Sequence, residues 1–302
     1  MALGYDGKLY ILAFDHRGSF QKKFFGVEGD PDEGETARIS DAKGVIYEGM
    51  LAALAAGAPR EAAGVLVDEQ FGAEVARKAK AEGLMLAMPV EKSGQNEFDF
   101  QYGAAFGDHI ADFDPSFNKV LVRWNPEGDA GMNQRQSARL KELSDWLHAN
   151  DRTFLFELLV PAEPAQLETV GGDVGRYDVE LRPALMRRAI AELQDAGIEP
   201  DIWKIEGIDR REDCEMIAEQ TRAGEGRAGV VCVVLGRGAD DAAVDHWLRT
   251  GSGVPGYVGF AIGRSNWWNP LKAFVDGSLP REAAAQQIGA NYRRFIDVYE
   301  GG

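Results

Sequence analysis

The amino-acid sequence predicts an α/β protein folded as a single (β/α)8 TIM barrel. Eight short runs rich in apolar and β-branched residues stop at Gly, Pro or a charged residue, which is typical of buried strands. Helical patterns lie between most of these runs, and this repeated alternation favours a closed parallel barrel. The length of 302 residues fits one such barrel without any linker-like change in composition, so we expect one domain over residues 1–302.

The predicted strands follow one another along the whole chain. They are KLYILAFD (8–15), AGVLVDEQ (63–70), LMLAMPVEK (84–92), KVLVRWNP (119–126), TFLFELLVP (153–161), DIWKIEG (201–207), GVVCVVLGRG (229–238) and YVGFAIGRS (257–265). Helical periodicity is clearest over 73–83, 135–150 and 181–197, and the last of these patterns ends in Gly197, a residue typical of helix C-termini. The first connection (20–59) is long, and we expect it to hold a loop and a helix that covers the site.

Charge and composition exclude several classes of partner. The net charge of −16 argues against binding to nucleic acid or to an anionic membrane, because phosphate contacts need a basic face. No run approaches ~18 uninterrupted apolar residues. Asp6 and Asp15 appear too early for a signal peptide, so we expect a cytoplasmic protein. An anionic small-molecule substrate would have to be held by locally concentrated Arg and Lys.

The two cysteines show neither metal-ligand spacing nor a disulfide framework. Cys214 lies in a polar helical stretch and Cys232 lies inside an apolar strand. We therefore expect one surface thiol and one core thiol.

Polar residues gather at the ends of the predicted strands, where barrel enzymes carry their chemistry. In chain order they are Asp15, His16, Arg17, Asp68, Glu69, Glu91, Lys92, Arg123, Asn125, Glu157, Lys204 and Glu206. A face with so many charges indicates a binding or catalytic site, although any one of these residues could equally belong to a barrel ion pair or a loop turn.

Strand alternation predicts which of these side chains face the barrel interior. In KVLVRWNP, Lys119 and Arg123 share one face, while the valines and Trp124 form the other, apolar face. In DIWKIEG, the same alternation places Lys204 and Glu206 inside. Lys204 is therefore predicted to be an interior lysine.

An interior lysine is costly unless it is paired, and burial beside other cations lowers the pKa of such a group. The resulting amine can attack a ketone or aldehyde to form a Schiff base, which acts as an electron sink for C–C bond cleavage or formation. The alternative is a structural ion pair between Lys204 and Glu206, Glu157 or Asp15.

A metal site is harder to build from this sequence. The four histidines (His16, His109, His148 and His246) are spread over a strand end, a loop and two helical stretches, so several imidazoles do not easily meet around zinc. The remaining metal hypothesis is Mg²⁺ bound by Asp15, Asp68 and Glu69, since this hard ion prefers oxygen ligands. We expect a site that needs no metal and no cofactor.

The last two strands end in a related motif, Gly-Arg followed by a small residue. The loops after strands seven and eight commonly bind phosphate in barrel enzymes. Glycine allows close approach to backbone N–H groups, a helix N-terminus adds its dipole, and arginine supplies a fork of donors. The predicted phosphate site consists of Gly236, Arg237, Gly263, Arg264 and Ser265. Arg264 and Ser265 are the stronger candidates because a helix start follows them.

The motifs also resemble a known family in order along nearly the whole chain. They are AFDHRGSF, VLVDEQFG, PVEKSG, KVLVRWNPEGD, FLFELLVPA, WKIEG, VVLGRGADD and GFAIGRSNWW. This set resembles the barrel domain that in many bacteria is fused behind the sugar kinase of myo-inositol catabolism and is associated with 2-deoxy-5-keto-gluconate 6-phosphate aldolase activity. More distantly, it resembles class I tagatose 1,6-bisphosphate aldolases and sulfo-sugar aldolases.

The resemblance implies roles for particular residues. Lys204 matches the Schiff-base lysine, Lys119 and Glu157 match a lysine and a glutamate that assist proton transfer, and Gly263 and Arg264 match the phosphate-binding turn. The motif DHRGS carries His16 where the wider family has an amide.

The expected function is therefore that of a class I aldolase. It would cleave 2-deoxy-5-keto-gluconate 6-phosphate to dihydroxyacetone phosphate and malonate semialdehyde, whose carboxylate would meet Arg17, Lys92 or Arg123. Asp15, His16 and Glu206 would complete the substrate site.

Other functions remain open at this stage. They are an aldolase for another ketose phosphate of the tagatose bisphosphate or sulfo-sugar type, an isomerase or epimerase using Glu157 and Glu206, and a non-catalytic sugar-phosphate-binding module that partners a kinase. The resemblance implies a functional link to a sugar kinase, and the sequence leaves homo-oligomerisation open.

Overall fold

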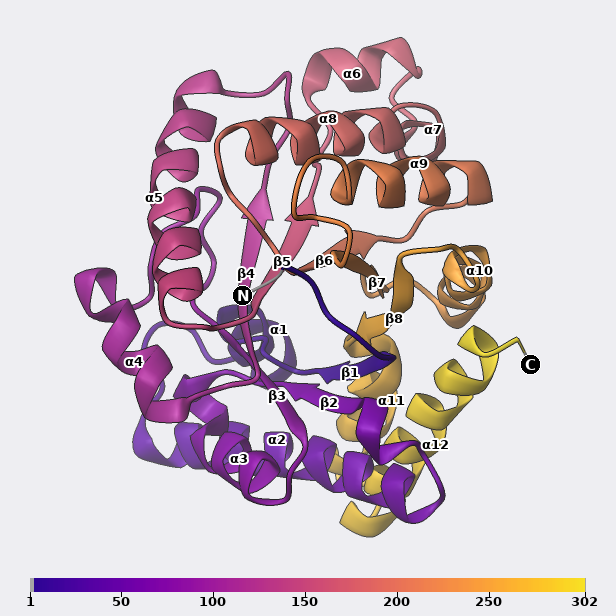
Figure 1. Cartoon of the computed structure of the whole chain (residues 1–302). Coiled ribbons are helices and arrows are strands. Elements are labelled where there is room, and N and C mark those ends of the chain that lie inside the picture. Colours follow the sequence, from indigo (N-terminus) through magenta and orange to yellow (C-terminus); the bar gives the residue numbers. More distant parts are fainter. Residues whose placement is uncertain (1–2, 302) are drawn as a thin grey trace.

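The computed structural model describes residues 3–301 as a closed barrel of eight parallel strands surrounded by helices (Figure 1). The strands are β1 (Leu9–Ala13), β2 (Ala63–Leu66), β3 (Met85–Pro89), β4 (Phe117–Arg123), β5 (Phe154–Leu159), β6 (Ile202–Glu206), β7 (Val231–Leu235) and β8 (Tyr257–Ile262). Each pairs with its neighbour in sequence, and β8 closes the barrel against β1. The predicted fold class and all eight strands are confirmed.

Strand boundaries differ from the predicted runs in one consistent way. Most strands end before the polar residues that close the run, so Asp15, Asp68 and Arg237 lie just beyond β1, β2 and β7. These polar groups sit in loops because no neighbouring strand continues the ladder past the barrel rim. At the other end, β4 begins at Phe117, ahead of the run predicted from Lys119.

The helices form a ring outside the strands (Figure 1). They are α1 (Gly18–Phe25), α2 (Glu33–Ala55), α3 (Glu69–Ala81), α4 (Phe106–Phe113), α5 (Ala130–Ala149), α6 (Pro164–Thr169), α7 (Val174–Glu180), α8 (Arg182–Asp195), α9 (Arg211–Thr221), α10 (Asp241–Gly251), α11 (Arg264–Val275) and α12 (Arg281–Tyr299). As predicted, Gly197 follows the end of α8 in the left-handed conformation, with φ of 74°. None of the helices described within residues 3–301 is long and apolar enough to span a bilayer.

The long first connection contains two helices rather than the one expected. α1 contributes Ser19 and Lys23 to the wall of the main cavity. α2 lies in the outer ring and packs against α12 and α3. It begins at a capping box in which Asp32 accepts from the Glu35 backbone and the Glu35 side chain accepts from the Asp32 backbone. Only α1 therefore reaches the site that this connection was expected to cover.

The lower part of the barrel interior is an apolar layer. It consists of Leu9, Ile11, Ala13, Leu66, Ala87, Phe117, Leu155, Ile202, Val231, Val233 and Ala261. Because side chains alternate along a strand, the residue two positions after an inward apolar residue also faces inward, one layer higher. Ile202 is followed in this way by Lys204, and Leu155 by Glu157, which is aligned with Lys204 in the β5–β6 ladder.

The expectation of one exposed thiol is wrong, because both cysteines are buried. Cys214 begins the apolar stripe of α9, which continues through Ile217, Ala218 and Thr221 at helical spacing. The polar residues that suggested a surface position lie on the opposite face of the same helix.

Both thiols are expected to be unreactive in the native protein. Burial raises the pKa of Cys214 and of Cys232 to about 12, so little reactive thiolate is present at neutral pH. A chromogenic thiol reagent should give no rapid signal from the native chain and a signal equal to both cysteines after unfolding in guanidinium. A rapid equivalent from the native protein would contradict the buried position of Cys214.

Candidate functional site

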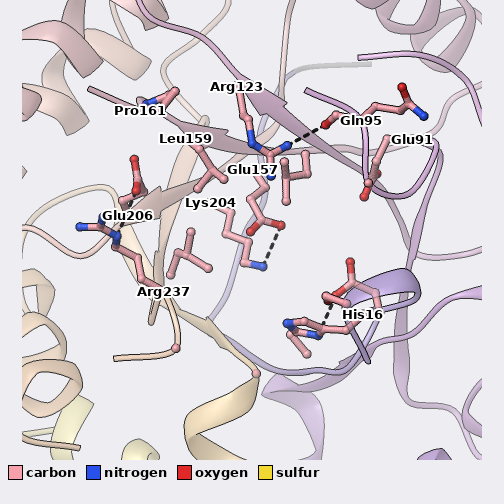
Figure 2. A pocket seen from close by; sticks show the side chains of 18 of the residues that line it. His16, Glu91, Gln95, Arg123, Glu157, Leu159, Pro161, Lys204, Glu206 and Arg237 are labelled. Atoms are coloured by element: carbon pink, nitrogen blue, oxygen red, sulfur yellow. Dashed lines mark hydrogen bonds and ion pairs between the residues drawn. The ribbon is translucent and has the colours of Figure 1, made fainter. Parts of the chain in front are cut away.

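A cavity of about 570 Å³ opens at the C-terminal ends of the strands (Figure 2). Among the residues singled out by the sequence, those that line it are Asp15, His16, Arg17, Glu91, Lys92, Lys119, Arg123, Glu157, Lys204, Glu206, Arg237, Gly263 and Arg264. Gly236 and Ser265 are not among the lining residues. The Ser265 hydroxyl instead donates to the Ala239 carbonyl at 3.0 Å. The neighbouring Gly238, the small residue of the first Gly-Arg motif, does line the cavity.

The floor of the cavity carries a chain of alternating charges. Lys204 Nζ lies 3.0 Å from Glu157 Oε2, and the same oxygen lies 3.1 Å from Lys119 Nζ. All three side chains are buried, with 2% of Lys204, 6% of Glu157 and 1% of Lys119 exposed. Figure 2 shows the Lys204 amine directed at the Glu157 carboxylate in the centre of the cavity. Because the three groups are buried and in direct contact, their charges depend on one another.

Lys119 is the cation around which the acidic side chains gather. Its Nζ lies 2.8 Å from Asp15 Oδ2 and 2.8 Å from Glu91 Oε1, in addition to its contact with Glu157. Burial lowers the pKa of Lys119, but the attraction of Asp15, Glu157 and Glu91 outweighs burial and holds the pKa above its usual range. Lys119 therefore remains a fixed positive charge at neutral pH.

The pKa values of the carboxylates around Lys119 are shifted in different directions. Burial raises the pKa of Asp15 and of Glu157, but the cations outweigh burial in both, Lys119 first, and hold each pKa below its usual value. For Glu91, burial prevails over Lys119 and Arg17, and the pKa is raised. The Oε2 atom of Glu91 is buried without a hydrogen-bond partner, which agrees with a group that is poorly solvated as an anion.

Glu206 is already engaged by other protein groups. Its Oε2 accepts from the Val160 backbone N–H at 2.8 Å, and its Oε1 lies 3.2 Å from Arg237 Nε. Arg237 also donates to Asp178 Oδ2 at 2.6 Å, so this arginine joins β6 to α7. Burial raises the pKa of Glu206 against the opposing effect of Arg182 and Arg237. The predicted interior position of Glu206 is observed, and the side chain serves there as an anchor for Arg237.

The two Gly-Arg turns meet at one side of the cavity. Arg264 is the first residue of α11, and its Nη2 donates to the Arg237 carbonyl at 2.8 Å. Arg237 has φ of 51°, a left-handed conformation that is uncommon for a residue other than glycine. Gly263 must be glycine, because a Cβ there would lie 2.6 Å from the Ala13 carbonyl oxygen. The turn after β8 is thereby pressed against the end of β1.

The opposite side of the cavity carries a second group of cations. Arg123 Nη1 donates to the Gln95 carbonyl at 2.9 Å, and Figure 2 shows Arg123 and Arg237 on different sides of Lys204. Lys92 lies on the exposed loop after β3. Arg17 is buried, with Nη2 donating to the Glu91 carbonyl at 2.7 Å, so it supports this loop as well as lining the cavity.

The carboxylates considered for Mg²⁺ do not converge. Asp68 pairs with the buried Lys43 and caps α3 by accepting from the Phe71 N–H at 2.9 Å. Glu69 lies on α3 beside His109, with 3.3 Å between Oε2 and Nδ1. Within residues 3–301, no group of three or more His, Cys, Asp or Glu side chains is arranged to hold a metal ion. The convergent acids of this site surround Lys119 instead.

Residues 5–301 match DUF2090, a family described as an uncharacterized protein conserved in bacteria. The chain belongs to this family. No curated protein matches the DUF2090 chain. Its fold matches solved structures over nearly its full length.

Three solved structures illustrate this similarity. An archaeal fructose 1,6-bisphosphate aldolase has 16% identity and a TM-score of 0.60, over 98% of the DUF2090 chain and 95% of its own. A Schiff-base-forming fructose-1,6-bisphosphate aldolase has 14% identity and a TM-score of 0.56, over 94% of each chain. A protein of Corynebacterium glutamicum has 19% identity and a TM-score of 0.57, over 97% of the DUF2090 chain and 88% of its own. At these identities the similarity establishes the (β/α)8 barrel fold alone.

Sequence reasoning missed several cavity residues of this DUF2090 protein. Glu91 was noted at a strand end, but its contact with Lys119 was not foreseen, because β3 ends at Pro89 and the chain then turns. Asp178 and Tyr177 lie on the short helix α7, which carries no strong sequence signal.

Proposed function

We propose that this protein is a class I aldolase that forms a Schiff base through Lys204. The observation that carries the proposal is the buried contact of 3.0 Å between Lys204 Nζ and Glu157 Oε2 at the floor of a large polar cavity. An amine that attacks a carbonyl must first lose its proton, and Glu157 lies where it can accept that proton. The structural ion-pair alternative predicts the same contact but no covalent chemistry, so a chemical test separates them.

The proposed reaction starts from a phosphorylated keto sugar acid. The Lys204 amine, having given a proton to Glu157, adds to the ketone carbon. Glu157 returns that proton to the departing hydroxyl, so loss of water leaves a protonated imine and an ionised Glu157. Glu157 removes the proton from the hydroxyl two carbons away. That carbon becomes an aldehyde as its bond to the carbon next to the imine breaks, and the electron pair of the broken bond forms an enamine. Protonation of the enamine and hydrolysis by water release dihydroxyacetone phosphate and regenerate Lys204.

Lys119 supports this sequence as a fixed charge. It contacts the same Glu157 oxygen as Lys204, at 3.1 Å, and it remains protonated because three carboxylates raise its pKa. When the Lys204 amine becomes neutral, Glu157 loses one of its two cationic neighbours and becomes a stronger base. Lys119 then keeps the carboxylate in position without taking part in proton transfer itself.

The anionic ends of the substrate would bind on different sides of Lys204. The phosphate is assigned to Arg264, the N-terminus of α11 and the glycine turns at Gly238 and Gly263, which line the cavity together. Arg123, Lys92 and Arg17 line its other side and suit a carboxylate. This arrangement favours 2-deoxy-5-keto-gluconate 6-phosphate, with malonate semialdehyde as the second product, over a substrate with one anionic end. The aldolase names of two of the solved structures with this fold agree with the reaction class.

Borohydride trapping is expected to identify Lys204 as the nucleophile. The protein is incubated with dihydroxyacetone phosphate and a chelator, reduced with borohydride, and weighed by mass spectrometry. One stable adduct should form, and peptide mapping should place it on Lys204. A wild-type protein that binds the sugar phosphate but forms no adduct would contradict the aldolase proposal and favour a binding module or a non-covalent isomerase.

A further inference from the structure

His16 occupies a position in the cavity that neither the ion pairs nor the proposed mechanism explains. The side chain is 26% exposed and lines the cavity, while its Nδ1 atom is buried without a hydrogen-bond partner (Figure 2). Nδ1 faces Asp15 Oδ1 at 4.0 Å. The ring edge packs against Trp267, with 5.4 Å between the centroids and 79° between the planes. The ring is therefore held on one side, and we infer that its exposed edge turns Nε2 toward the cavity.

The surroundings keep the imidazole of His16 neutral. Burial and the cations Arg264, Lys43 and Lys204 lower its pKa to about 4, and the opposing effect of Asp15 is smaller. Asp15 favours the tautomer that carries its proton on Nδ1, because a carboxylate oxygen lies 4.0 Å from this nitrogen. The lone pair of Nε2 then remains free on the cavity side, which is the arrangement of an oriented general base.

The other acid–base groups at this depth are already engaged. Lys119 bonds to Asp15 Oδ2 at 2.8 Å and to Glu91 Oε1 at 2.8 Å. The Oε2 atom of Glu157 contacts both Lys119 and Lys204. An aldolase also needs a group that moves a proton at the carbon next to the imine, and the Glu157 contact places that carboxylate beside the nitrogen. His16 and Lys204 line the same cavity, and Figure 2 shows both side chains there.

We propose that His16, oriented by Asp15, is the residue that removes and returns the proton on the carbon next to the imine formed by Lys204. This inference rests on the proposed function and assigns a step within it. Starting from the protonated imine of dihydroxyacetone phosphate, Nε2 takes a proton from the hydroxymethyl carbon. The C–H electron pair becomes the C=C bond of the enamine, and the C=N π pair moves onto nitrogen. In the cleavage direction, neutral His16 first takes up a proton from solvent water. The imidazolium then gives this proton to the same carbon, where the enamine π pair forms the new C–H bond, and water hydrolyses the resulting imine.

The experiment separates imine formation from carbon deprotonation. Dihydroxyacetone phosphate is incubated with the full chain in D₂O, and loss of the hydroxymethyl proton signal is followed by NMR. The His16→Gln variant is expected to exchange this proton about 10²–10⁴-fold more slowly than the wild type, the usual contribution of a general acid–base residue. The yield of the borohydride adduct on Lys204 should be unchanged in the same variant.

A matched substitution controls for loss of a histidine elsewhere. His246 lies on α10, is 53% exposed at its side chain and contacts Asp209, so His246→Gln should exchange like the wild type. His16→Asn provides a second variant if His16→Gln does not fold, as judged by circular dichroism.

Several results would overturn the inference. Exchange of the hydroxymethyl proton at the wild-type rate in the His16 variants would contradict the inference directly. Loss of both adduct and exchange in a folded variant would assign His16 to binding instead of proton transfer. Absence of any adduct in the wild type would contradict the proposed function and this step with it. A normal adduct yield together with normal exchange in the His16 variants would contradict the role of His16 alone.

Discussion

Replacing Lys204 with arginine is expected to abolish C–C bond cleavage while the barrel remains folded. Arginine keeps a positive charge beside Glu157, but its guanidinium does not lose a proton in proteins and cannot form an imine. Removing the nucleophile of a covalent enzyme costs on the order of 10⁵-fold or more in turnover. Release of dihydroxyacetone phosphate from 2-deoxy-5-keto-gluconate 6-phosphate, followed by enzymatic reduction, measures this loss.

A surface substitution of the same kind provides the control. Lys272 on α11 is exposed and pairs with Asp276 at 3.0 Å, so Lys272→Arg should retain wild-type turnover. The variant at Lys204 should also show no borohydride adduct. Retention of more than about a hundredth of the wild-type turnover by Lys204→Arg, less than ~3 kcal/mol of lost transition-state stabilisation, would contradict covalent catalysis at this residue.

Replacing Lys119 with methionine is expected to cause the largest loss of stability. Asp15, Glu91 and Glu157 would lose their shared cation inside the barrel. Removing one partner of a buried ion pair costs about 3–5 kcal/mol, because a charge is left without compensation. Urea unfolding at neutral pH, followed by circular dichroism, measures the free energy of unfolding. Lys141→Met serves as the control because Lys141 forms an exposed pair with Asp145, and such pairs contribute ~0.5 kcal/mol or less.

The pH dependence of the Lys119→Met variant follows from the signs of the shifts. In the wild type, Lys119 is the main reason that the pKa values of Asp15 and Glu157 are lowered. Without it, burial raises these pKa values above those of the unfolded chain. Protonation then favours the folded state, so the stability deficit relative to the wild type should shrink as the pH falls from neutral toward the acidic range. A deficit that grows on acidification would contradict the burial of uncompensated carboxylates.

The barrel was predictable because its signals are local. Each strand is a short apolar run that ends near a turn or a charge, and alternation within DIWKIEG was enough to place Lys204 inside. The register that brings Glu157 beside Lys204 also follows from inward-facing residues on adjacent strands. These features depend on the two-residue period of a strand, which the sequence displays directly.

The contacts that were not foreseen depend on loops and on packing between distant elements. Glu91 reaches Lys119 only because the chain after β3 doubles back, with Glu91 bridged to Phe100. Asp178 reaches Arg237 from the short helix α7, far from Arg237 in the sequence. Cys214 appeared exposed because its helix is polar on average, although one stripe of it is buried. The periodicity of a single segment cannot predict such contacts between distant parts of the chain.

Closure of the barrel sets a condition on how the chain folds during synthesis. β1 has its second neighbour only in β8, where Tyr10 is aligned with Phe260, and the Ala13 carbonyl accepts from the Trp267 indole at 2.9 Å. Ribosomes add about 5–20 residues per second, so one edge of β1 stays unpaired for on the order of tens of seconds. The unpaired backbone N–H and C=O groups of an edge strand can form hydrogen bonds with other chains. The yield of folded protein should therefore depend on how well β1 is shielded until the last strand emerges.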